Sequence, residues 1–293
     1  MPFIKPSLFI FRQNLPTVTG SLFTFANIGK TANNGFDINL TTVNIKRKDL
    51  MWTTTVNAAW QKEHIVSLAT GSSDISNNWF VGQSIGVIYG YKTQGLWQAA
   101  DSVTYKAFNT NGSKFFPGNV RVADLNGDNK IDPNNDQQII GWTRPRWVIG
   151  MTNTVSFKGW EVSIFMYGRL NYLYNWGGEV EAARAVNRKI NYYNENNLNG
   201  EFQKPIFSSG GAAGDPYYTA LGYSKGSFLK IRNISIGHVF SNQILSKTGI
   251  SNLKVYAQVA NPGMLLSKLK FVELDVNGPT WNRGFTFGLN ASF

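Results

Sequence analysis

Hydrophobic and polar residues alternate one by one along several stretches of this chain. The alternation is clearest at the C-terminal end, where one face collects Trp281, Phe285, Phe287, Leu289, Ala291 and Phe293. Thr286, Gly288 and Asn290 fall on the opposite face. A period of two residues is that of a β-strand, because successive side chains point to opposite sides. The pattern therefore predicts strands with one apolar and one polar face, and it recurs along residues 50–60, 160–166 and 253–259.

About nine strands are predicted in all. They lie near residues 7–13, 20–31, 34–47, 50–68, 146–157, 159–169, 226–240, 251–262 and 281–293. Counted from the last strand, every second connection is short, whereas two others span residues 70–145 and 170–225. Long antiparallel strands with loops gathered at one end are typical of a transmembrane β-barrel. We therefore predict an all-β barrel segment with long extracellular loops.

A soluble β-sandwich is the alternative, because a single sandwich strand shows the same alternation. Loops of this length are rare in a compact sandwich, which favours the barrel. Two strands change phase, near Thr41–Val43 and near Asn233, and a β-bulge would explain each change. Tryptophans fall at strand ends, as interfacial aromatic girdles do, although buried core positions would explain them equally well. These are Trp60, Trp147, Trp160 and Trp281.

Composition narrows the classes of function. Charged residues make up 15% of the chain, against about 25% in ordinary soluble domains. The net charge is +11, but the basic residues are scattered and no nucleic-acid motif accompanies them. The absence of cysteine excludes disulfides and thiolate metal sites, and only His64 and His238 offer imidazole. No apolar run approaches the roughly 18 residues of a spanning helix, and the first residues do not match a secretory signal.

Several stretches carry a resemblance to a known family. They are "ADLNGDNKID" (123–132), "GSFLKIRNISIGHVF" (226–240), "VYAQVANP" (255–262) and the closing "RGFTFGLNASF" (283–293). Upstream, "GSLFTFANIGKTANNGFDINL" and "GVIYGYKTQGLW" add to it. In this order and spacing the chain resembles the C-terminal barrel half of the SusC/RagA-type, TonB-linked outer-membrane transporters of Bacteroidetes.

The resemblance implies a place in the outer membrane and a part in the import of glycans or oligopeptides, without bond chemistry. It also implies a SusD-like surface lipoprotein at the extracellular loops and TonB acting through a plug region that this chain lacks. Bacterial single-chain barrels have an even number of strands, and a spanning sheet cannot leave an unpaired edge in lipid, so nine strands do not form a closed barrel of this kind. We therefore expect residues 1–293 to be a C-terminal fragment of such a receptor barrel. The rival functions are a secreted carbohydrate-binding sandwich and a hydrolase using His64 or the glutamates Glu179, Glu181 and Glu195.

One motif carries metal chemistry. Oxygen-bearing side chains recur at every second residue of an EF-hand-like loop, with a carbonyl at the seventh position. The candidate calcium ligands are Asp124, Asn126, Asp128, the Lys130 carbonyl and Asp132, with Asp136 supplying a late carboxylate. Asn129 replaces the usual turn glycine, and it too can adopt a left-handed conformation. An ordinary turn of Asp, Asn and Gly remains the alternative.

Three further expectations concern the loop end. Arg144, Arg146 and Arg169 are expected to meet lipopolysaccharide phosphates or acidic ligand groups. Residues 178–190 show helical spacing, which predicts a short helix in one loop. Many aromatics also fall in the loops, where they either stack on sugar rings or pack the loops together, and packing is favoured. They are Trp79, Phe80, Tyr89, Tyr91, Trp97, Tyr172, Tyr174, Trp176, Tyr217 and Tyr218.

Overall fold

A computed structural model describes residues 7–14, 18, 20, 23–69, 71–108, 115–176, 189–205, 215–241, 245, 249–276 and 282–293. The chain divides into two compact units. The sheet unit comprises residues 1–66, 145–172 and 225–293, and the loop unit comprises residues 67–144 and 173–224. Both parts of the loop unit are therefore insertions between strands of the sheet unit. They overlap the two long connections expected from the sequence, whose extracellular position stays a prediction.

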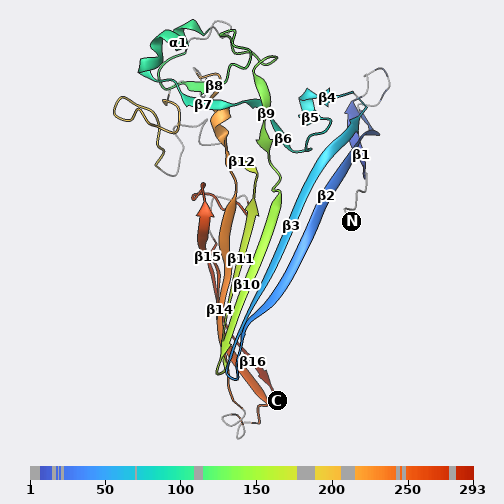
Figure 1. The fold of residues 1–293 in the computed structure, drawn as a ribbon, viewed down its shortest axis with the longest axis vertical. Coiled ribbons are helices and arrows are strands. Elements are labelled where there is room, and N and C mark those ends of the chain that lie inside the picture. The colour runs from blue at the N-terminus through green and yellow to red at the C-terminus, as the bar shows by residue number, and fades with distance from the viewer. Residues whose placement is uncertain are drawn as a thin grey trace. The chain divides into compact units, whose positions relative to one another are not determined.

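The sheet unit holds an eight-stranded sheet whose spatial order follows the chain order (Figure 1). Its strands are β1 (Ser7–Asn14), β2 (Phe23–Lys46), β3 (Leu50–Leu68), β10 (Trp147–Phe157), β11 (Trp160–Leu170), β14 (Phe228–Val239), β15 (Asn252–Ser267) and β16 (Gly284–Ser292). Strand β1 pairs antiparallel with β2, and every neighbouring pair from β3 to β16 is antiparallel as well. This up-and-down order is that of outer-membrane barrels, and the antiparallel all-β prediction is confirmed.

The register produces two adjacent rows of opposite character, because residues directly opposite in an antiparallel pair share one face. The apolar row is Trp52, Val155, Val162, Ile236, Ala257 and Phe287. The neighbouring polar row is Thr53, Thr154, Ser163, Ser235, Gln258 and Thr286. The sheet thus has an apolar face and a polar face across six strands.

The apolar face lies open. Phe285, Phe287 and Leu289 expose 69%, 80% and 67% of their surface. A β-sandwich would bury such side chains against a second sheet. The sandwich alternative is therefore wrong, and the apolar face has the exposure expected of a surface that contacts lipid.

The height of the apolar face fits a bilayer. Strand β10 has 11 residues, and Trp147 and Phe157 stand at its two ends. Ten steps of about 3.3 Å, tilted by about 40°, rise roughly 25 Å, which is the height of the apolar band of an outer-membrane barrel. Trp60 lies opposite Trp147 at one end, and Trp160 lies opposite Phe157 at the other. The expected aromatic positions are thus occupied at both ends of this strand, while Trp281 lies outside the described residues.

Within the described residues, no helix combines the length and the apolar character needed to cross a membrane.

One predicted turn is wrong. The segments 20–31 and 34–47 were expected to be two strands, but residues 23–46 form the single strand β2. Gly35 packs against the neighbouring strand, since a Cβ atom there would lie 2.8 Å from the Trp60 carbonyl oxygen. Asn33-Asn34-Gly35 therefore reflects a close approach of two backbones and not a reversal. The described sheet consequently has eight strands, which removes the argument from an odd count.

The bulge predicted near Asn233 is confirmed. The register shifts between Phe165 and Met166 in the β11–β14 pair, and between Ile231 and Asn233 in the β14–β15 pair. Arg232 is thereby the extra residue of β14. The bulge predicted at Thr41–Val43 stays a prediction.

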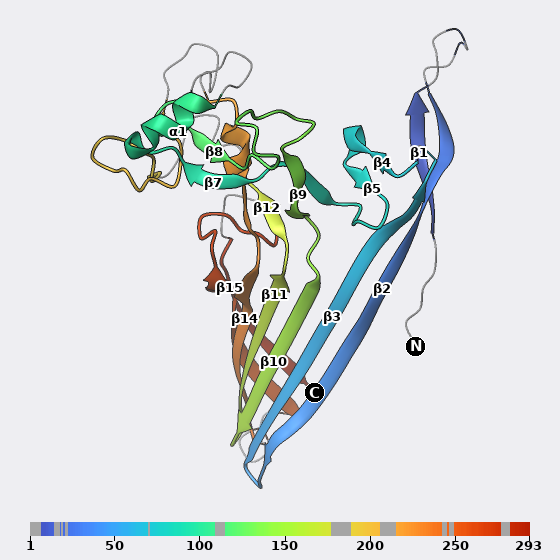
Figure 2. The same cartoon turned by 45° about the horizontal axis from the view of Figure 1, so that its top comes forward.

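The loop unit consists of short elements. These are β4 (Ser73–Asp74), η2 (Ile75–Asn77), β5 (Trp79–Phe80), β6 (Val87–Tyr91), β7 (Thr93–Leu96), η3 (Ala99–Asp101), α1 (Ser102–Ala107), β8 (Val120–Val122), β9 (Gln137–Trp142), β12 (Leu173–Asn175), η4 (Tyr218–Gly222) and β13 (Tyr223–Lys225). The strands pair as β4 with β5, β6 with β9, β7 with β8 and β12 with β13. Figure 2 shows β4 beside β5 and β7 beside β8. The helix expected at 178–190 lies almost entirely outside the described residues.

This unit has its own hydrophobic core. The core gathers Trp97, Tyr105, Phe115, Val120, Val122, Ile131, Tyr217 and Ala220. Trp97 is 1% exposed, and its ring lies 5.8 Å from that of Phe115 and 6.1 Å from that of Tyr105. The two long connections therefore fold into a packed body.

Candidate functional site

The polar face of the sheet is the first candidate surface. Its hydroxyl groups contact each other across strands, as between Thr154 and Ser163 at 3.2 Å. A single ion pair joins β15 to β11, from Lys254 Nζ to Glu161 Oε1 at 2.8 Å. Both side chains of this pair are about a third exposed, at 31% and 40%. A polar face of this kind lines the interior of a transmembrane barrel.

A second, denser ion cluster lies on the same unit. Lys230 of β14 is fully buried, and its Nζ lies 2.7 Å from Glu273 Oε1 and 2.8 Å from Asp275 Oδ2. Arg232 also pairs with Asp275, and Arg169 of β11 approaches Asp275 Oδ1 at 3.4 Å. We call these five residues the ion cluster. Burying an ammonium group is costly unless carboxylates compensate it, and the two acids supply that compensation to Lys230.

The cations and the acids of the ion cluster come from different kinds of structure. Arg169, Lys230 and Arg232 belong to strands, and the β14 bulge supplies Arg232 as an additional residue. Glu273 and Asp275 belong to the segment 268–276 that follows β15, outside the named strands. Figure 2 shows the trace that leaves β15 curling back beside the end of β14. The sheet thus fixes the cations, while a connecting segment brings the acids.

The Asp-rich segment of the loop unit forms a ladder of side-chain to backbone hydrogen bonds. Asp124 accepts from the backbone N–H groups of Gly127 at 2.7 Å and Asn129 at 2.9 Å. Asp128 accepts from Lys130 N–H at 2.8 Å. Asn129 has φ of 61°, the left-handed conformation expected when it replaces the turn glycine. The loop therefore has the curvature of a cation-binding loop, and also that of a plain Asx-turn series.

Two further carboxylates, those of Asp132 and Asp136, accept hydrogen bonds from backbone N–H groups of this loop. Asp136 is fully buried and accepts from Leu125 N–H and Asp132 N–H, both at 2.8 Å. Asp132 accepts from Asn134 N–H at 2.8 Å, and this bond is the main cause that lowers the pKa of its carboxyl group. Among the described residues, no group of three or more acidic or imidazole side chains is arranged to hold a metal. Asp136 thus braces the loop, and calcium at Asp124, Asn126, Asp128, Lys130 and Asp132 stays a prediction.

No family model matches the chain. Two curated proteins of Formosa agariphila are similar to it. TonB-dependent receptor P3 is 26% identical over 280 residues, which cover 88% of this chain and 26% of the receptor. TonB-dependent receptor P39 is 24% identical over 299 residues, which cover 86% of this chain and 28% of that receptor. The chain is thus similar to TonB-dependent receptors over most of its length.

Solved structures show the same fold as this chain. The structure of the RagAB peptide transporter matches 96% of the chain with a TM-score of 0.68 at 16% identity, and the chain covers 31% of it. The RagAB peptide importer in its "open-open" state matches 100% of the chain with a TM-score of 0.72 at 15% identity, with 32% of that structure covered. The chain spans about a quarter of the length of the curated relatives it matches.

These findings confirm the SusC/RagA-type resemblance, the transmembrane β-barrel fold and the location in the outer membrane. The relatives are receptors and transporters, which agrees with the expectation that the chain is not an enzyme. For the hydrolase alternative, Glu179 and Glu181 lie outside the described residues, Glu195 is exposed, and the residue beside His64, Glu63, pairs with Arg146 at 2.9 Å.

The predicted basic residues of the chain differ in their surroundings. Arg146 is 5% exposed and pairs with Glu63, so the expectation that it meets lipopolysaccharide phosphates is wrong for this residue. Arg169 belongs to the ion cluster, and its Nε donates to the Tyr167 hydroxyl at 2.9 Å. Arg144 is exposed. Sequence reasoning missed Lys230, Glu273 and Asp275, although a lysine inside an otherwise apolar strand pattern was an available signal.

Several aromatic side chains of the loop unit pack against one another. Trp79, Trp97 and Tyr217 are 6%, 1% and 7% exposed. The ring of Tyr91 lies 4.9 Å from that of Tyr217, and burial raises the pKa of the Tyr217 hydroxyl. These three buried rings are therefore core residues and do not present their faces to a sugar, as the packing interpretation predicted.

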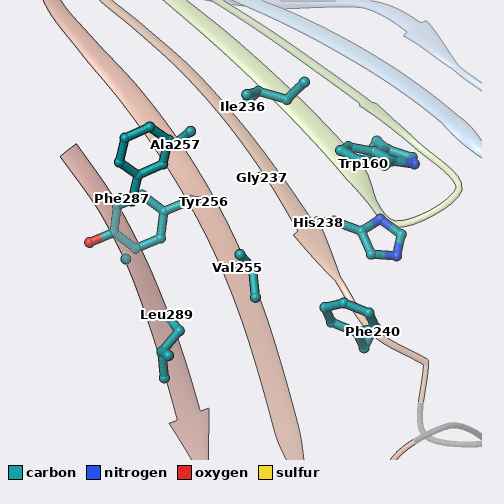
Figure 3. A pocket seen from close by; sticks show the side chains of 11 residues that line it. Trp160, Ile236, Gly237, His238, Phe240, Val255, Tyr256, Ala257, Phe287 and Leu289 are labelled. Carbon is teal, nitrogen blue, oxygen red and sulfur yellow. The ribbon is translucent and has the colours of Figure 1, made fainter. Parts of the chain in front are cut away.

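The apolar face of the sheet carries a hollow at the short-turn end (Figure 3). Trp160, His238 and Phe240 stand along one side, and Phe287 and Leu289 along the other. The smaller side chains of β15, Val255 and Ala257, lie between them. The rings of Trp160 and His238 are 4.7 Å apart, which closes that side. An apolar hollow on this face has the character of a lipid-contacting surface and not of a polar ligand site.

Proposed function

We propose that this chain forms part of the wall and the extracellular entrance of a TonB-dependent importer in the outer membrane. The observation that carries the proposal is the pair of adjacent rows, one apolar and exposed, the other polar, that cross six strands of the sheet. Such a wall separates lipid from an aqueous interior through which a polar solute passes. The similarity to TonB-dependent receptors supports an import role.

The proposed substrate is an oligopeptide, with a glycan as the alternative. The structural relatives are titled a peptide transporter and a peptide importer, which favours a peptide. We further propose a SusD-like lipoprotein over the loop unit and TonB acting through a plug region. Lipid tails would cover the apolar face, and Arg144 is the exposed cation available for lipopolysaccharide phosphates.

The test uses the native outer-membrane protein that carries this chain. Cells with and without it are given fluorescent oligopeptides and oligosaccharides, before and after the proton gradient is collapsed. We expect gradient-dependent entry of peptides, and co-purification of a surface lipoprotein with the intact protein. Entry that is identical without the protein would contradict the proposed function, and entry of oligosaccharides alone would replace the peptide by the glycan.

A further inference from the structure

We propose that Arg169, Lys230 and Arg232 form a binding site for an acidic oligopeptide, and that segment 268–276 fills this site with Glu273 and Asp275 until the peptide displaces it. The inference rests on the proposed import function and adds a preference in charge. The segment acts as an internal competitor, because it presents carboxylates where the ligand would present its own.

The charges of the ion cluster do not balance. Three cations face two acids, so a net positive charge remains when the segment is in place. All three cations sit on strands, whose positions the sheet fixes. When the segment leaves, the cations lose both carboxylate partners, and an incoming anion can take the place of those carboxylates. The site is therefore strongly selective for negative charge.

The bound segment also indicates the form of the ligand. Its two acids are separated by one residue, Leu274, whose side chain is 1% exposed. An acidic, an apolar and an acidic residue in succession thus occupy the site. Arg232 and Arg169 keep 44% and 31% of their side chains exposed, so an incoming peptide can meet them before Lys230 is uncovered. A peptide containing Glu-Leu-Asp reproduces what the site already holds.

The ion pair between Lys254 and Glu161 offers a comparison with the ion cluster. Lys254 and Glu161 join β15 to β11 directly, without any connecting segment. Neutralising both residues removes one ion pair from the same face while leaving the ion cluster intact. This pair is therefore a matched control.

The experiment measures binding of a fluorescent peptide, Ser-Glu-Leu-Asp-Ser with blocked ends, to the native protein in detergent. We expect Glu273→Gln with Asp275→Asn to bind it at least tenfold more tightly than the unaltered protein. Adding Arg232→Gln to that background should remove most of the gain, whereas Lys254→Gln with Glu161→Gln should leave the affinity unchanged. The neutral counterpart of this peptide is Ser-Gln-Leu-Asn-Ser. If the double acid variant gains no affinity for the acidic peptide, or gains as much affinity for the neutral one, the proposal is overturned. Tight binding of trigalacturonate without binding of the acidic peptide would overturn it as well.

A second measurement does not depend on the acid variants. The chain contains no cysteine, so Leu274→Cys introduces the one thiol of this chain at a buried position. The acidic peptide should raise the rate of thiol labelling at least several-fold, and the neutral peptide should not. Equal labelling with both peptides contradicts displacement by charge. Import of the neutral peptide is measured in parallel. If the neutral peptide is imported while the charge of the peptide has no effect on binding or labelling, only this inference fails. If neither the unaltered protein nor any variant imports a peptide, the proposed function fails.

Discussion

The two units of this chain use apolar residues in opposite ways. In the sheet unit, Phe285, Phe287 and Leu289 expose most of their surface, while polar residues occupy the other face. In the loop unit, Trp97 and Val120 are 1% and 0% exposed. The exposed apolar face of the sheet unit suits contact with lipid tails. The loop unit buries its apolar side chains as a domain in water does, because burial of apolar area drives folding there. The same residue types can therefore mark a membrane surface in one segment and a core in the next.

The largest expected effect comes from opening the core of the loop unit. Trp97→Ala removes a side chain that touches Tyr105, Phe108 and Phe115, and it should cost about 3–5 kcal/mol of the unit's stability. Protease sensitivity of the loop unit in the native protein measures this loss, with outer-membrane insertion as the control that should not change. If insertion fails as well, the two units are not independent in the way the comparison requires.

An introduced charge should destabilise the barrel more on the lipid-facing side of the sheet than on the side that faces the interior. Ile164 and Ser163 are neighbours on β11 and point to opposite faces. Ile164→Arg should destabilise the inserted barrel by about 2–4 kcal/mol, because it buries a charge in lipid. Ser163→Arg should cost much less, since its face lines the polar interior. Urea unfolding in lipid vesicles compares the two, and equal losses would argue against the assignment of the faces.

The fold of the sheet unit could be predicted from the sequence because the period of two is local. The alternation around Phe285 to Leu289 and the phase change at Asn233 both carried over into the structure. The turn predicted at Gly35 was wrong because the conformation there depends on a contact that is distant in sequence. Its role depends on the Trp60 carbonyl of the neighbouring strand, and nothing next to Asn33-Asn34-Gly35 in sequence distinguishes a turn from a close approach.

The candidate sites were less predictable, because their contacts are distant along the chain. Lys230 meets Glu273 across 43 residues, and no spacing rule connects a strand residue to a connecting segment so far away. The Asp-rich loop could be recognised in the sequence because its oxygen-bearing side chains lie within a few residues of one another. Even there, the hydrogen bond from Leu125 N–H to buried Asp136 depends on the fold of the whole loop, and the sequence alone did not predict it. The prediction that Asp136 is also a metal ligand stays a prediction.

Calcium should stabilise the loop unit alone. At about 1 mM Ca²⁺ and a dissociation constant near 0.1 mM, typical of extracellular sites, the gain is about 1.4 kcal/mol. Calorimetry on the native protein measures the binding heat, and Asp124→Asn with Asp128→Asn should abolish it. The absence of heat at millimolar calcium in the unaltered protein would leave the loop as a plain turn series.

The smallest effect concerns pH, and again it belongs to the loop unit. Burial is the main cause that raises the pKa of Asp215 above its ordinary 3.8, even though Val120 and Tyr217 donate backbone N–H groups to it at 2.7 and 3.1 Å. The folded state therefore holds this proton more tightly than the unfolded chain does. The stability that this proton contributes is fully present below the ordinary pKa and is lost as pH rises through the raised one.

Asp74 should show the opposite sign within the same unit. The Ser76 hydroxyl is the main cause that lowers its pKa, so its contribution is present above 3.8 and is lost as pH falls through the lowered value. Melting of the loop unit between about pH 3 and about pH 7 should therefore change slope in opposite directions for Asp215→Asn and Asp74→Asn. Both residues lie outside the sheet, so unfolding of the barrel should keep its pH profile in either variant. Parallel shifts of the two slopes would mean that burial at Asp215 does not dominate its hydrogen bonds.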